Sequence, residues 1–471
     1  MTALSSPQAR RLHPARPVRR RPSINAWARD VVGVVTWSSV LVVVALWVAG
    51  GGVRDLTSAA AGLTSAGRLT GLVASNLLLI QVLLMARIPP LERTYGQDEL
   101  ARRHRLVGLA SFWLMVTHIA LITVGYALEV DLNPFAQLWE LVTDYPGMLL
   151  ATAGTVSLVL VVVTSIRRAR KRLRYESWHL LHLYAYLGVG LALPHQLWTG
   201  QEFLSSPVAT VYWWTLWACA AGAILLWRVG LPLYRSIAHD LRVHAVVDEG
   251  PGVVSVWLRG RNLHRLPVAA GQFFVWRFLA GSGWTRGHPY SLSAAPGDDT
   301  LRITVKHLGD GSGGLAGLRP GTRVLFEGPF GKLHSGVRTR RGVTLLASGI
   351  GITPMRALLE ELPQGPGDVT VIHRAHDAGQ LALREEVEAL AAERGARLFH
   401  VLGPRITDRE SWLPRSAAHL SDSEALLHLV PHIAETDVYL CGPDPWMAAA
   451  SAAALDCGVP ASRVHSERFS W

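Results

Sequence analysis

The stretch RHRLVGLASFWLMVTHIALITVGYAL, residues 103–128, places two histidines in an otherwise apolar run. His104 and His118 are fourteen residues apart, which on an α-helix is roughly 21 Å along the axis and about 40° short of four full turns. Both rings would therefore lie on nearly one face, one toward each end of the helix. Polar groups in such surroundings are rare and usually functional. The stretch predicts a membrane-spanning helix whose two imidazoles require partners.

The composition of the chain favours a membrane protein. It has 471 residues, 49% of them hydrophobic, and a formal net charge of +11, and this length predicts about three domains. Basic residues cluster at the N-terminus and between apolar runs, which is typical of membrane topology and not of a nucleic-acid-binding surface. The three cysteines, Cys219, Cys441 and Cys457, supply neither a disulfide framework nor the ligands of an iron–sulfur cluster. We therefore expect no ferredoxin domain on this chain.

Six apolar runs approach the ~20 residues that a bilayer core requires. Residues 1–30 are rich in arginine, proline and serine and predict a disordered cytoplasmic tail. The apolar run that follows the tail is too long for a signal peptide. The six runs are 31–49, 69–86, 106–127, 148–166, 178–197 and 208–229.

The charges of the loops predict the orientation. The tail, residues 87–105, residues 167–174 and the segment after Arg228 are basic, whereas the intervening loops carry acidic residues. By the positive-inside rule both termini are cytoplasmic, and we expect an integral protein of a bacterial-type plasma membrane. The third and fifth runs then both pass from inside to outside, so that His104 lies near the inner face.

The fifth run, YESWHLLHLYAYLGVGLALPHQLW, repeats the arrangement, with His179 or His182 near the inner end and His195 near the outer end. Two histidines at each depth from two helices suit two b-type haems stacked across a bilayer. Zinc or copper would require ligands gathered at one depth, and polar helix ends would explain single histidines but not matched pairs. On an ideal helix His182 and His195 lie about 140° apart, and Pro194 is a local cause of a correcting kink.

These spacings resemble the ferric reductase transmembrane domain that NADPH oxidases and ferric-chelate reductases share. Thirteen residues separate the histidines of the third run, and twelve separate His182 from His195. The resemblance implies that His104 and His182 ligate the inner haem and that His118 and His195 ligate the outer one, with His179 as a neighbour.

Two further positions bear on the outer haem. The resemblance implies that Arg68, at the outer end of the second run, lies near this haem, the alternative being an arginine that extends to the membrane surface. Ile122 stands where some oxidases place another histidine. Position 122 therefore does not favour oxygen as the molecule that accepts electrons from the outer haem.

After about residue 236 the composition becomes that of a water-soluble protein. Short alternating runs broken by glycine and proline predict an antiparallel β-barrel of about 100 residues. Three motifs follow in order: HPYSLS at His288–Ser293, VKHLGDGS at Val305–Ser312, and EGPFG at Glu327–Gly331. Together they resemble the flavin-binding barrel of the ferredoxin–NADP reductase superfamily.

This second resemblance implies roles in binding FAD. Tyr290 packs on the flavin, Ser291 offers a hydroxyl near the reactive ring nitrogens, and Ser312 meets the pyrophosphate. The superfamily usually begins the first motif with arginine, and His288 replaces it here, as in the oxidase and ferric reductase branch. The other expected flavin-binding residues are Pro289, Leu292, Ser293 and Lys306.

The last part of the chain predicts a nucleotide-binding domain. The order of a buried strand VTLLAS, a glycine turn and a helix is that of a phosphate-binding loop, and the later strand–helix alternation predicts a Rossmann-like parallel sheet with helices on both sides. The sequence resembles the pyridine-nucleotide domain of the same superfamily. The resemblance implies two sets of contacts: Gly349, Gly351, Thr353 and Pro354 at the pyrophosphate, and Cys441, Gly442 and Pro443 at the nicotinamide.

Two arginines and the chain end complete the expected site. Arg374 and Arg405 can pair with a 2′-phosphate, which favours NADPH over NADH; the alternative is that both are solvated surface arginines. The chain ends VHSERFSW, which resembles the family's closing carboxylate and aromatic. The resemblance implies that Phe469 covers the flavin, with Trp471 as the alternative.

The expected fold is therefore a six-helix transmembrane bundle, an antiparallel β-barrel FAD domain and an α/β Rossmann-like nucleotide domain. The resemblance implies an NAD(P)H oxidoreductase that passes electrons from cytoplasmic NADPH or NADH through FAD and two haems to O2 or to a ferric or cupric chelate, with Ser291, Cys441 and Phe469 at the reacting atoms. The alternative is a haem subunit that serves a protein partner or senses redox state. We expect the bilayer and a small-molecule acceptor as partners, no nucleic acid and no obligatory protein. The domain bounds are 1–30, 31–235, 236–340 and 341–471.

Overall fold

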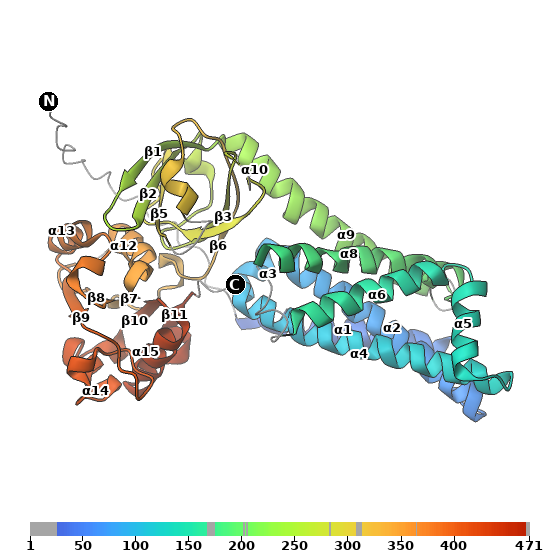
Figure 1. The fold of residues 1–471 in the computed structure, drawn as a ribbon. Coiled ribbons are helices and arrows are strands. Elements are labelled where there is room, and N and C mark those ends of the chain that lie inside the picture. The colour runs from blue at the N-terminus through green and yellow to red at the C-terminus, as the bar shows by residue number, and fades with distance from the viewer. Residues whose placement is uncertain are drawn as a thin grey trace. The chain divides into compact units, whose positions relative to one another are not determined.

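The computed structural model describes residues 26–166, 175–200, 203, 206–281, 284–307, 313–363 and 365–467. They form two compact units, one ending at Gly230 and the other beginning at Leu231 (Figure 1). Most of the expected N-terminal tail and the basic run 167–174 lie outside the described residues.

The first unit is helical. Its longer helices follow the apolar runs of the sequence, and side chains cap several of them, as Ser58 caps α2 and Ser206 caps α9. The helices are α1 (Ala26–Ala49), α2 (Ala59–Met85), α3 (Pro89–Tyr95), α4 (Gln97–Glu129), α5 (Pro134–Asp144), α6 (Met148–Ser165), α8 (Tyr175–Trp198) and α9 (Pro207–Ala223), followed by a π-helical turn η1 (Ile224–Gly230).

Within the described residues, five helices are long and apolar enough to cross a membrane. They are α1, α2, α4, α6 and the helix that begins with α9 at Pro207. The fifth predicted run forms the 24-residue helix α8, but it is not one of the five. Its mean hydropathy is lower because the helix contains several polar residues and a proline, among them His182, Pro194, His195 and Gln196. The structure therefore supports a membrane-spanning helical region and leaves the count of six unconfirmed.

Glycines set the close contacts within this unit. Helix α2 packs along α4, and α6 packs along α8. A Cβ atom on Gly154 of α6 would stand 2.8 Å from the carbonyl oxygen of Gly188 on α8, so that only glycine permits this approach. Among the described residues, the backbones of α4 and α8 do not pack closely against each other. The two helices that carry the histidines are thus each supported by a different neighbour.

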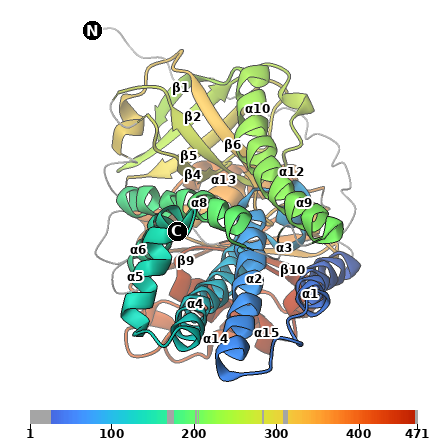
Figure 2. The same cartoon turned by 90° about the vertical axis from the view of Figure 1, so that its right-hand side faces the viewer.

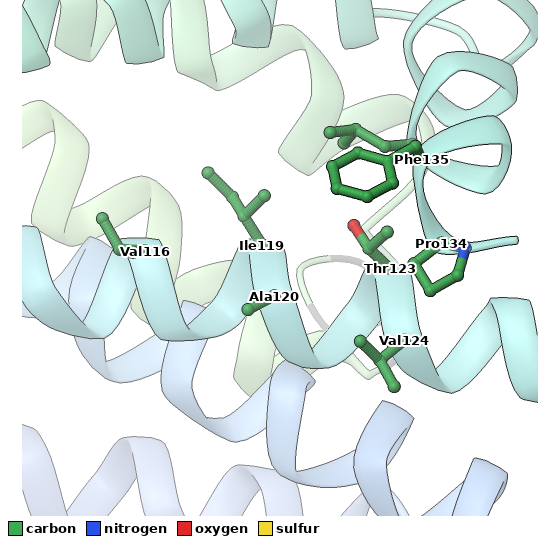
Figure 3. Close-up of a pocket in the computed structure, with 8 residues that line it drawn as sticks. Val116, Ile119, Ala120, Thr123, Val124, Pro134 and Phe135 are labelled. Carbon is green, nitrogen blue, oxygen red and sulfur yellow. The ribbon is translucent and has the colours of Figure 1, made fainter.

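Helix α5 was not predicted from the sequence. The Asn133 side chain caps it by accepting from the Phe135 N–H at 2.8 Å, and the helix runs crosswise to α4 and α6 (Figure 1). Between α4 and α5 lies an apolar pocket of about 280 Å³. Figure 3 shows Ile119 and Thr123 of α4 and Phe135 of α5 around this space.

The second unit begins with α10 (Leu231–His239) and two antiparallel three-stranded sheets, β1-β2-β5 and β4-β3-β6. Side chains from both sheets, including Phe274, Trp276 and Phe326, share one buried core. Isolated bridges, Leu292 with Ile303 and Arg242 with Arg323, link the two sheets. Among the described residues these links are single bridges, so the strands form two sheets and not one continuous closed barrel. The strands are β1 (Arg242–Asp248), β2 (Val253–Arg259), β3 (Phe273–Phe278), β4 (His288–Ser291), β5 (Thr300–Lys306) and β6 (Val324–Phe330).

A five-stranded parallel sheet of order β11-β10-β7-β8-β9 follows. Helices α12 and α13 cover one face and α14 and α15 the other (Figure 2). The predicted parallel sheet with helices on both sides is confirmed. Its elements are β7 (Val343–Ser348), α12 (Ile352–Glu361), β8 (Val369–Ala375), α13 (Arg384–Arg394), β9 (Arg397–Leu402), α14 (Asp422–Leu429), β10 (Asp437–Cys441), α15 (Asp444–Asp456) and β11 (Val464–Ser466).

Candidate functional site

The inner histidines of α4 and α8 face each other. The ring centroids of His104 and His182 are 6.0 Å apart. The Nδ1 of His104 donates to the carbonyl of Gln81 at 3.2 Å, and the Nδ1 of His182 lies 3.3 Å from the Ser165 hydroxyl. An imidazole that donates through Nδ1 keeps the Nε2 lone pair for a metal. Two imidazoles on opposite sides of one metal ion have centroids roughly 6 Å apart, because each metal–nitrogen bond is about 2.0–2.1 Å.

The outer histidines form a second pair, close enough to interact electrostatically. The Nδ1 of His118 donates to the carbonyl of Gly67 at 2.8 Å. A Cβ on Gly71 would stand 2.5 Å from that nitrogen, so glycine is required where the ring lies against α2. Within the described residues, the buried Nδ1 of His195 makes no hydrogen bond.

This donor set fits b-type haem. Each pair offers two imidazoles from helices whose backbones stand apart, and α2 carbonyls orient both rings of α4. Within the residues that the structure describes, no group of three or more His, Cys, Asp or Glu side chains is arranged to hold a metal ion. Two-imidazole sites suit axial ligation of a haem better than they suit zinc.

The expected outer arginine is already paired. Arg68 lies on α2 one residue after Gly67, and its guanidinium bonds to the Asp55 carboxylate. Its side chain is 21% exposed, so it lies at the edge of the bundle.

The antiparallel part of the second unit, strands β1 to β6, is called the flavin-like half below. Its strand β4 presents His288 and Tyr290 on one face. Their rings are nearly parallel, with centroids 6.0 Å apart. Burial raises the pKa of Tyr290 to about 12, so its hydroxyl stays protonated and can donate a hydrogen bond. The Trp276 Nε1 donates to the Tyr290 carbonyl at 3.0 Å, which fixes the strand.

The remaining expected flavin residues are placed unevenly. Ser291 is buried, Pro289 and Lys306 are half-buried, and Leu292 lies in the sheet core. Ser293 is fully buried, and its hydroxyl accepts from Arg302 Nε at 3.0 Å. Ser312 lies outside the described residues.

The residues expected to contact the pyrophosphate and those expected to contact the nicotinamide meet at the carboxyl edge of the parallel sheet. Gly349 has a left-handed φ of 56°, which favours glycine, and any Cβ on Gly351 would collide with the Cys441 carbonyl. A Cβ on Gly442 would stand 2.8 Å from the Cβ of Ser348. The two loops interlock because β7 and β10 are parallel neighbours, with Cys441 opposite Ala347.

The N-terminus of α12 completes this loop. Thr353 and Pro354 are buried in its first turn, and the Thr353 hydroxyl donates to the Ile350 carbonyl at 3.0 Å. A helix that begins directly after a glycine turn directs its free N–H groups at an anion.

Cys441 connects this edge with the end of the described chain. Burial raises the pKa of its thiol well above the ordinary value, so the thiol is neutral. The sulfur lies 4.0 Å from the Glu467 carbonyl oxygen. The Glu467 carboxylate occupies the space that a side chain at Gly331, in the EGPFG motif, would fill. Phe469 and Trp471 lie outside the described residues.

The two arginines expected at a 2′-phosphate differ in exposure. Arg374 is buried, and its guanidinium donates to the carbonyls of Ala375 and Val401. Burial lowers the pKa of this guanidinium. Arg405 is exposed beyond the end of β9. The structure thus leaves Arg405, and not Arg374, at the surface.

Sequence reasoning missed His373. This fully buried residue of β8 lies beside the glycine turn Gly349–Gly351, called the nucleotide loop below. Its Nε2 donates to the Gly349 carbonyl at 3.2 Å. Burial lowers its pKa to about 4, so the ring is neutral. The available signal was a histidine inside the strand VTVIHRA, directly after the apolar residues Val371 and Ile372.

Comparisons with known proteins match both units. Residues 70–193 match the family of ferric reductase-like transmembrane components, and residues 345–452 match the oxidoreductase NAD-binding domain. The first match covers His104, His118 and His182 and ends two residues before His195, and the second covers the glycine loop and Cys441.

Individual relatives and solved structures share about a quarter to a third of the aligned residues with this chain. A flavohemoprotein of Bordetella pertussis is 28% identical over 320 residues, which cover 61% of this chain and 78% of the relative. The ferredoxin reductase component of a 3-ketosteroid-9-alpha-monooxygenase from Mycobacterium tuberculosis is 32% identical over 210 residues, 44% of this chain and 56% of the relative. The flavohem-like FAD/NAD-binding domain of nitric oxide dioxygenase from Vibrio cholerae is 25% identical, with a TM-score of 0.38 over 49% of this chain and 98% of that domain.

The two family matches occur in one chain and in the order that the sequence predicted. The chain joins a segment that matches ferric reductase-like transmembrane components to a segment that matches the oxidoreductase NAD-binding domain, an order that matches a fusion of the ferric reductase and NADPH oxidase kind, and it is a membrane NAD(P)H oxidoreductase.

Proposed function

We propose that this protein transfers electrons from cytoplasmic NAD(P)H through FAD and two b-type haems to an acceptor on the other side of the membrane. The observation that supports the proposal is the pairing of His104 with His182, whose ring centroids are 6.0 Å apart, on the same two helices that carry His118 and His195. The proposed acceptor is O2 or a ferric or cupric chelate, and both termini are cytoplasmic.

The first unit would hold the haems. His104 and His182 are the proposed inner ligands, and His118 and His195 the outer ones. The α2 carbonyls that accept from the Nδ1 atoms of His104 and His118 fix the ring proton on Nδ1 and orient both rings. Arg68, held by Asp55, would place a positive charge near the outer pair. When bound, FAD and the haems supply the redox chemistry that divides a hydride into single electrons.

The second unit would bind the nucleotide and the flavin. The loop Gly349–Gly351 and the N-terminus of α12 bind the pyrophosphate. The thiol of Cys441, which burial keeps neutral, would lie at the nicotinamide without adding a charge, and the protonated Tyr290 hydroxyl would be able to donate to the flavin. Phe469 or Trp471 covers the flavin. Of the two arginines, the exposed Arg405 is the better candidate for a 2′-phosphate, which retains the proposed preference for NADPH.

Replacing the outer ligands tests the proposal. We expect His118→Ala and His195→Ala, purified in nanodiscs, each to contain one haem per chain by the pyridine haemochrome assay, against two in the unaltered protein. Both variants should lose NADPH-driven reduction of an external acceptor and keep reduction of soluble ferricyanide by the flavin. The matched control is His179→Ala, which should keep both haems. Full acceptor reduction with two haems in the outer variants would defeat the ligand assignment.

The acceptor can be distinguished in the same nanodiscs. Cytochrome c reduction that superoxide dismutase inhibits identifies an oxidase, and Fe(II) formation that the dismutase does not affect identifies a metalloreductase. NADPH consumption with neither acceptor would leave the alternative function, a haem subunit that serves a protein partner or senses redox state.

A further inference from the structure

Two buried guanidinium groups converge on Ser293, the last residue of the HPYSLS motif. Arg302, on β5 of the flavin-like half, donates from Nη2 to the Ser293 carbonyl at 2.7 Å and from Nε to its hydroxyl at 3.0 Å. Arg356, in α12 just after the nucleotide loop, donates from Nη1 to the same carbonyl at 3.3 Å. One carbonyl oxygen therefore binds both halves of the second unit.

One carboxylate, that of Glu386, is shared by both arginines. Arg302 is 1% exposed and Arg356 is 5% exposed, and two buried positive charges require a nearby anion. Glu386 of α13 lies 2.8 Å from Arg302 Nη1, and its other oxygen lies 3.0 Å from Arg356 Nε as an ion pair without hydrogen-bond geometry. Burial alone would raise the pKa of Glu386, but the two arginines outweigh it and lower this pKa. The carboxylate is therefore ionised.

The other end of α12 is tied to the flavin-like half as well. Glu360, which pairs with Arg356, accepts from the Ala295 N–H at 2.7 Å. Glu361 accepts from the Ala270 N–H at 2.8 Å. Residues 270 and 295 lie on either side of β3 and β4. Carboxylates and guanidinium groups along α12 thus bind the backbone segments that flank the flavin-like strands.

The placement of these bonds suggests a role in hydride transfer. In the proposed function, Tyr290 and Ser291 contact the flavin three and two residues before Ser293, while the nucleotide lies on the loop that begins α12. Hydride transfer requires the reacting atoms about 3–3.5 Å apart, and a displacement of ~1 Å can cost a hundredfold in rate. A link between strand and helix must therefore be stiff, as bonds between buried charged groups are.

We propose that Arg302, Arg356 and Glu386 are positioning residues that hold the flavin-binding strand and the nucleotide loop in register for hydride transfer. The proposal rests on the proposed function, because it presupposes that both groups bind. It assigns these residues no contact with either group.

The test is the anaerobic reduction of bound flavin by NADPH, followed by stopped flow on the full chain in nanodiscs. Glu386→Gln removes the shared negative charge with little change in shape, and Glu385→Gln changes the exposed neighbouring carboxylate on the same helix as the matched control. We expect the flavin reduction rate at saturating NADPH to fall by about tenfold or more in Glu386→Gln. FAD content and the NADPH concentration for half-maximal rate should stay within about twofold of the unaltered protein.

A second variant keeps the test valid if Glu386→Gln does not fold. In Arg302→Met/Arg356→Met/Glu386→Leu the whole ionic triad becomes apolar, an exchange that often preserves stability, and we expect the same slowed flavin reduction at normal FAD content. An unchanged reduction rate per bound FAD in either variant, with or without a lower melting temperature, would overturn the positioning role. Absence of flavin reduction by NADPH and NADH in the unaltered protein would overturn the proposed function itself, and this inference with it.

Discussion

Backbone carbonyls, and not acidic side chains, orient the imidazoles of α4. Gln81 and Gly67 each offer a carbonyl oxygen of α2 to an Nδ1 atom. A carbonyl oxygen can only accept a hydrogen bond and is fixed by its helix, so the neutral ring that it holds keeps its proton on Nδ1. Control of the rings therefore depends on how closely α4 approaches α2.

Gly71 provides a test of that approach. In Gly71→Val the new side chain would begin 2.5 Å from the His118 Nδ1, so the ring must leave its place against α2. We expect the haem content of the purified protein to fall from two per chain to one, measured by pyridine haemochrome. Gly222→Ala on α9, where a Cβ meets nothing within 4 Å, should keep both haems. An unchanged haem content in Gly71→Val would contradict the placement of His118.

His373 should act on the nucleotide and not on the flavin. His373→Ala leaves the Gly349 carbonyl without its donor, and a lost hydrogen bond of ~1–1.5 kcal/mol corresponds to about five- to tenfold in affinity. We expect the KM for NADPH to rise by about this factor at unchanged FAD content, measured by steady-state ferricyanide reduction.

Two further variants qualify the His373 result. His373→Gln, whose amide can donate, should recover part of the loss, and His432→Ala, at an exposed position of the same domain, should change nothing. A raised KM in the His432 variant, or none in His373→Ala, would show that the Gly349 contact does not matter for binding.

Helix α5 has one exposed aromatic side and an opposite side that carries both buried residues and an acid. Phe135 is 85% exposed and Trp139 is 72% exposed on one side, while Gln137 and Leu141 are buried. At ~100° per residue, Asp144 lies on the side opposite Phe135. Exposed aromatics on one side and an acid on the other are typical of a helix lying at the surface of a bilayer.

Site-directed spin labelling can test the position of α5. With Cys219 and Cys457 replaced by alanine, we expect a nitroxide at Phe135→Cys to be relaxed more by O2 than by a water-soluble nickel complex. A nitroxide at Asp144→Cys should show the reverse. Equal accessibility at the two positions would place α5 away from the lipid.

Apolar periodicity explains which elements were predictable. Long apolar runs predicted α1, α2, α4 and α6, and alternating strands predicted the antiparallel half, because each pattern is local. Helix α5 mixes apolar, acidic and buried polar residues within 11 positions, so no single period marks it. The open barrel also escaped prediction, because sheet closure depends on pairing between strands distant in sequence, with register shifts at Val243 and Phe273.

The site was predictable to the same extent. Histidine spacing and the glycine loop are local sequence patterns. In the first unit the structure places His104 beside His182, and in the second unit it places Gly351 against Cys441. The choice of His182 depends on the rotation of a helix that contains Pro194, which sequence spacing does not set. The contacts of Ser293 with Arg302, and of Arg302 with Glu386 84 positions later, depend on how separate chain segments pack.

At the scale of the molecule, the buried Asp437 and the partly exposed Glu386 predict acid sensitivity of the second unit. Burial would raise the pKa of Asp437, but His465 at 2.9 Å and the N–H groups of Thr339 and Arg340 outweigh it, so this pKa is lowered. The pKa of Glu386 is lowered too. A carboxyl with a lower pKa in the folded state stabilises the fold above its unfolded pKa, and this contribution is lost as pH falls through the folded value.

We therefore expect the melting temperature of the second unit, followed by circular dichroism of the whole protein, to decline between about pH 5 and pH 3. Asp437→Asn should lower the melting temperature near neutral pH and make this decline shallower. A decline of unchanged steepness in the variant would exclude Asp437 as a cause.

The shared carboxylate Glu386 has a consequence for chimeric reductases. A flavin module is naturally cut from its nucleotide module at the change of fold near residue 341, but Arg302 lies before that cut while Arg356 and Glu386 lie after it. A flavin module grafted at that boundary would replace Arg302, while Arg356 and Glu386 would remain. Recombination between relatives should therefore succeed only when position 302 is inherited with positions 356 and 386. In this fold the unit of exchange is larger than either domain.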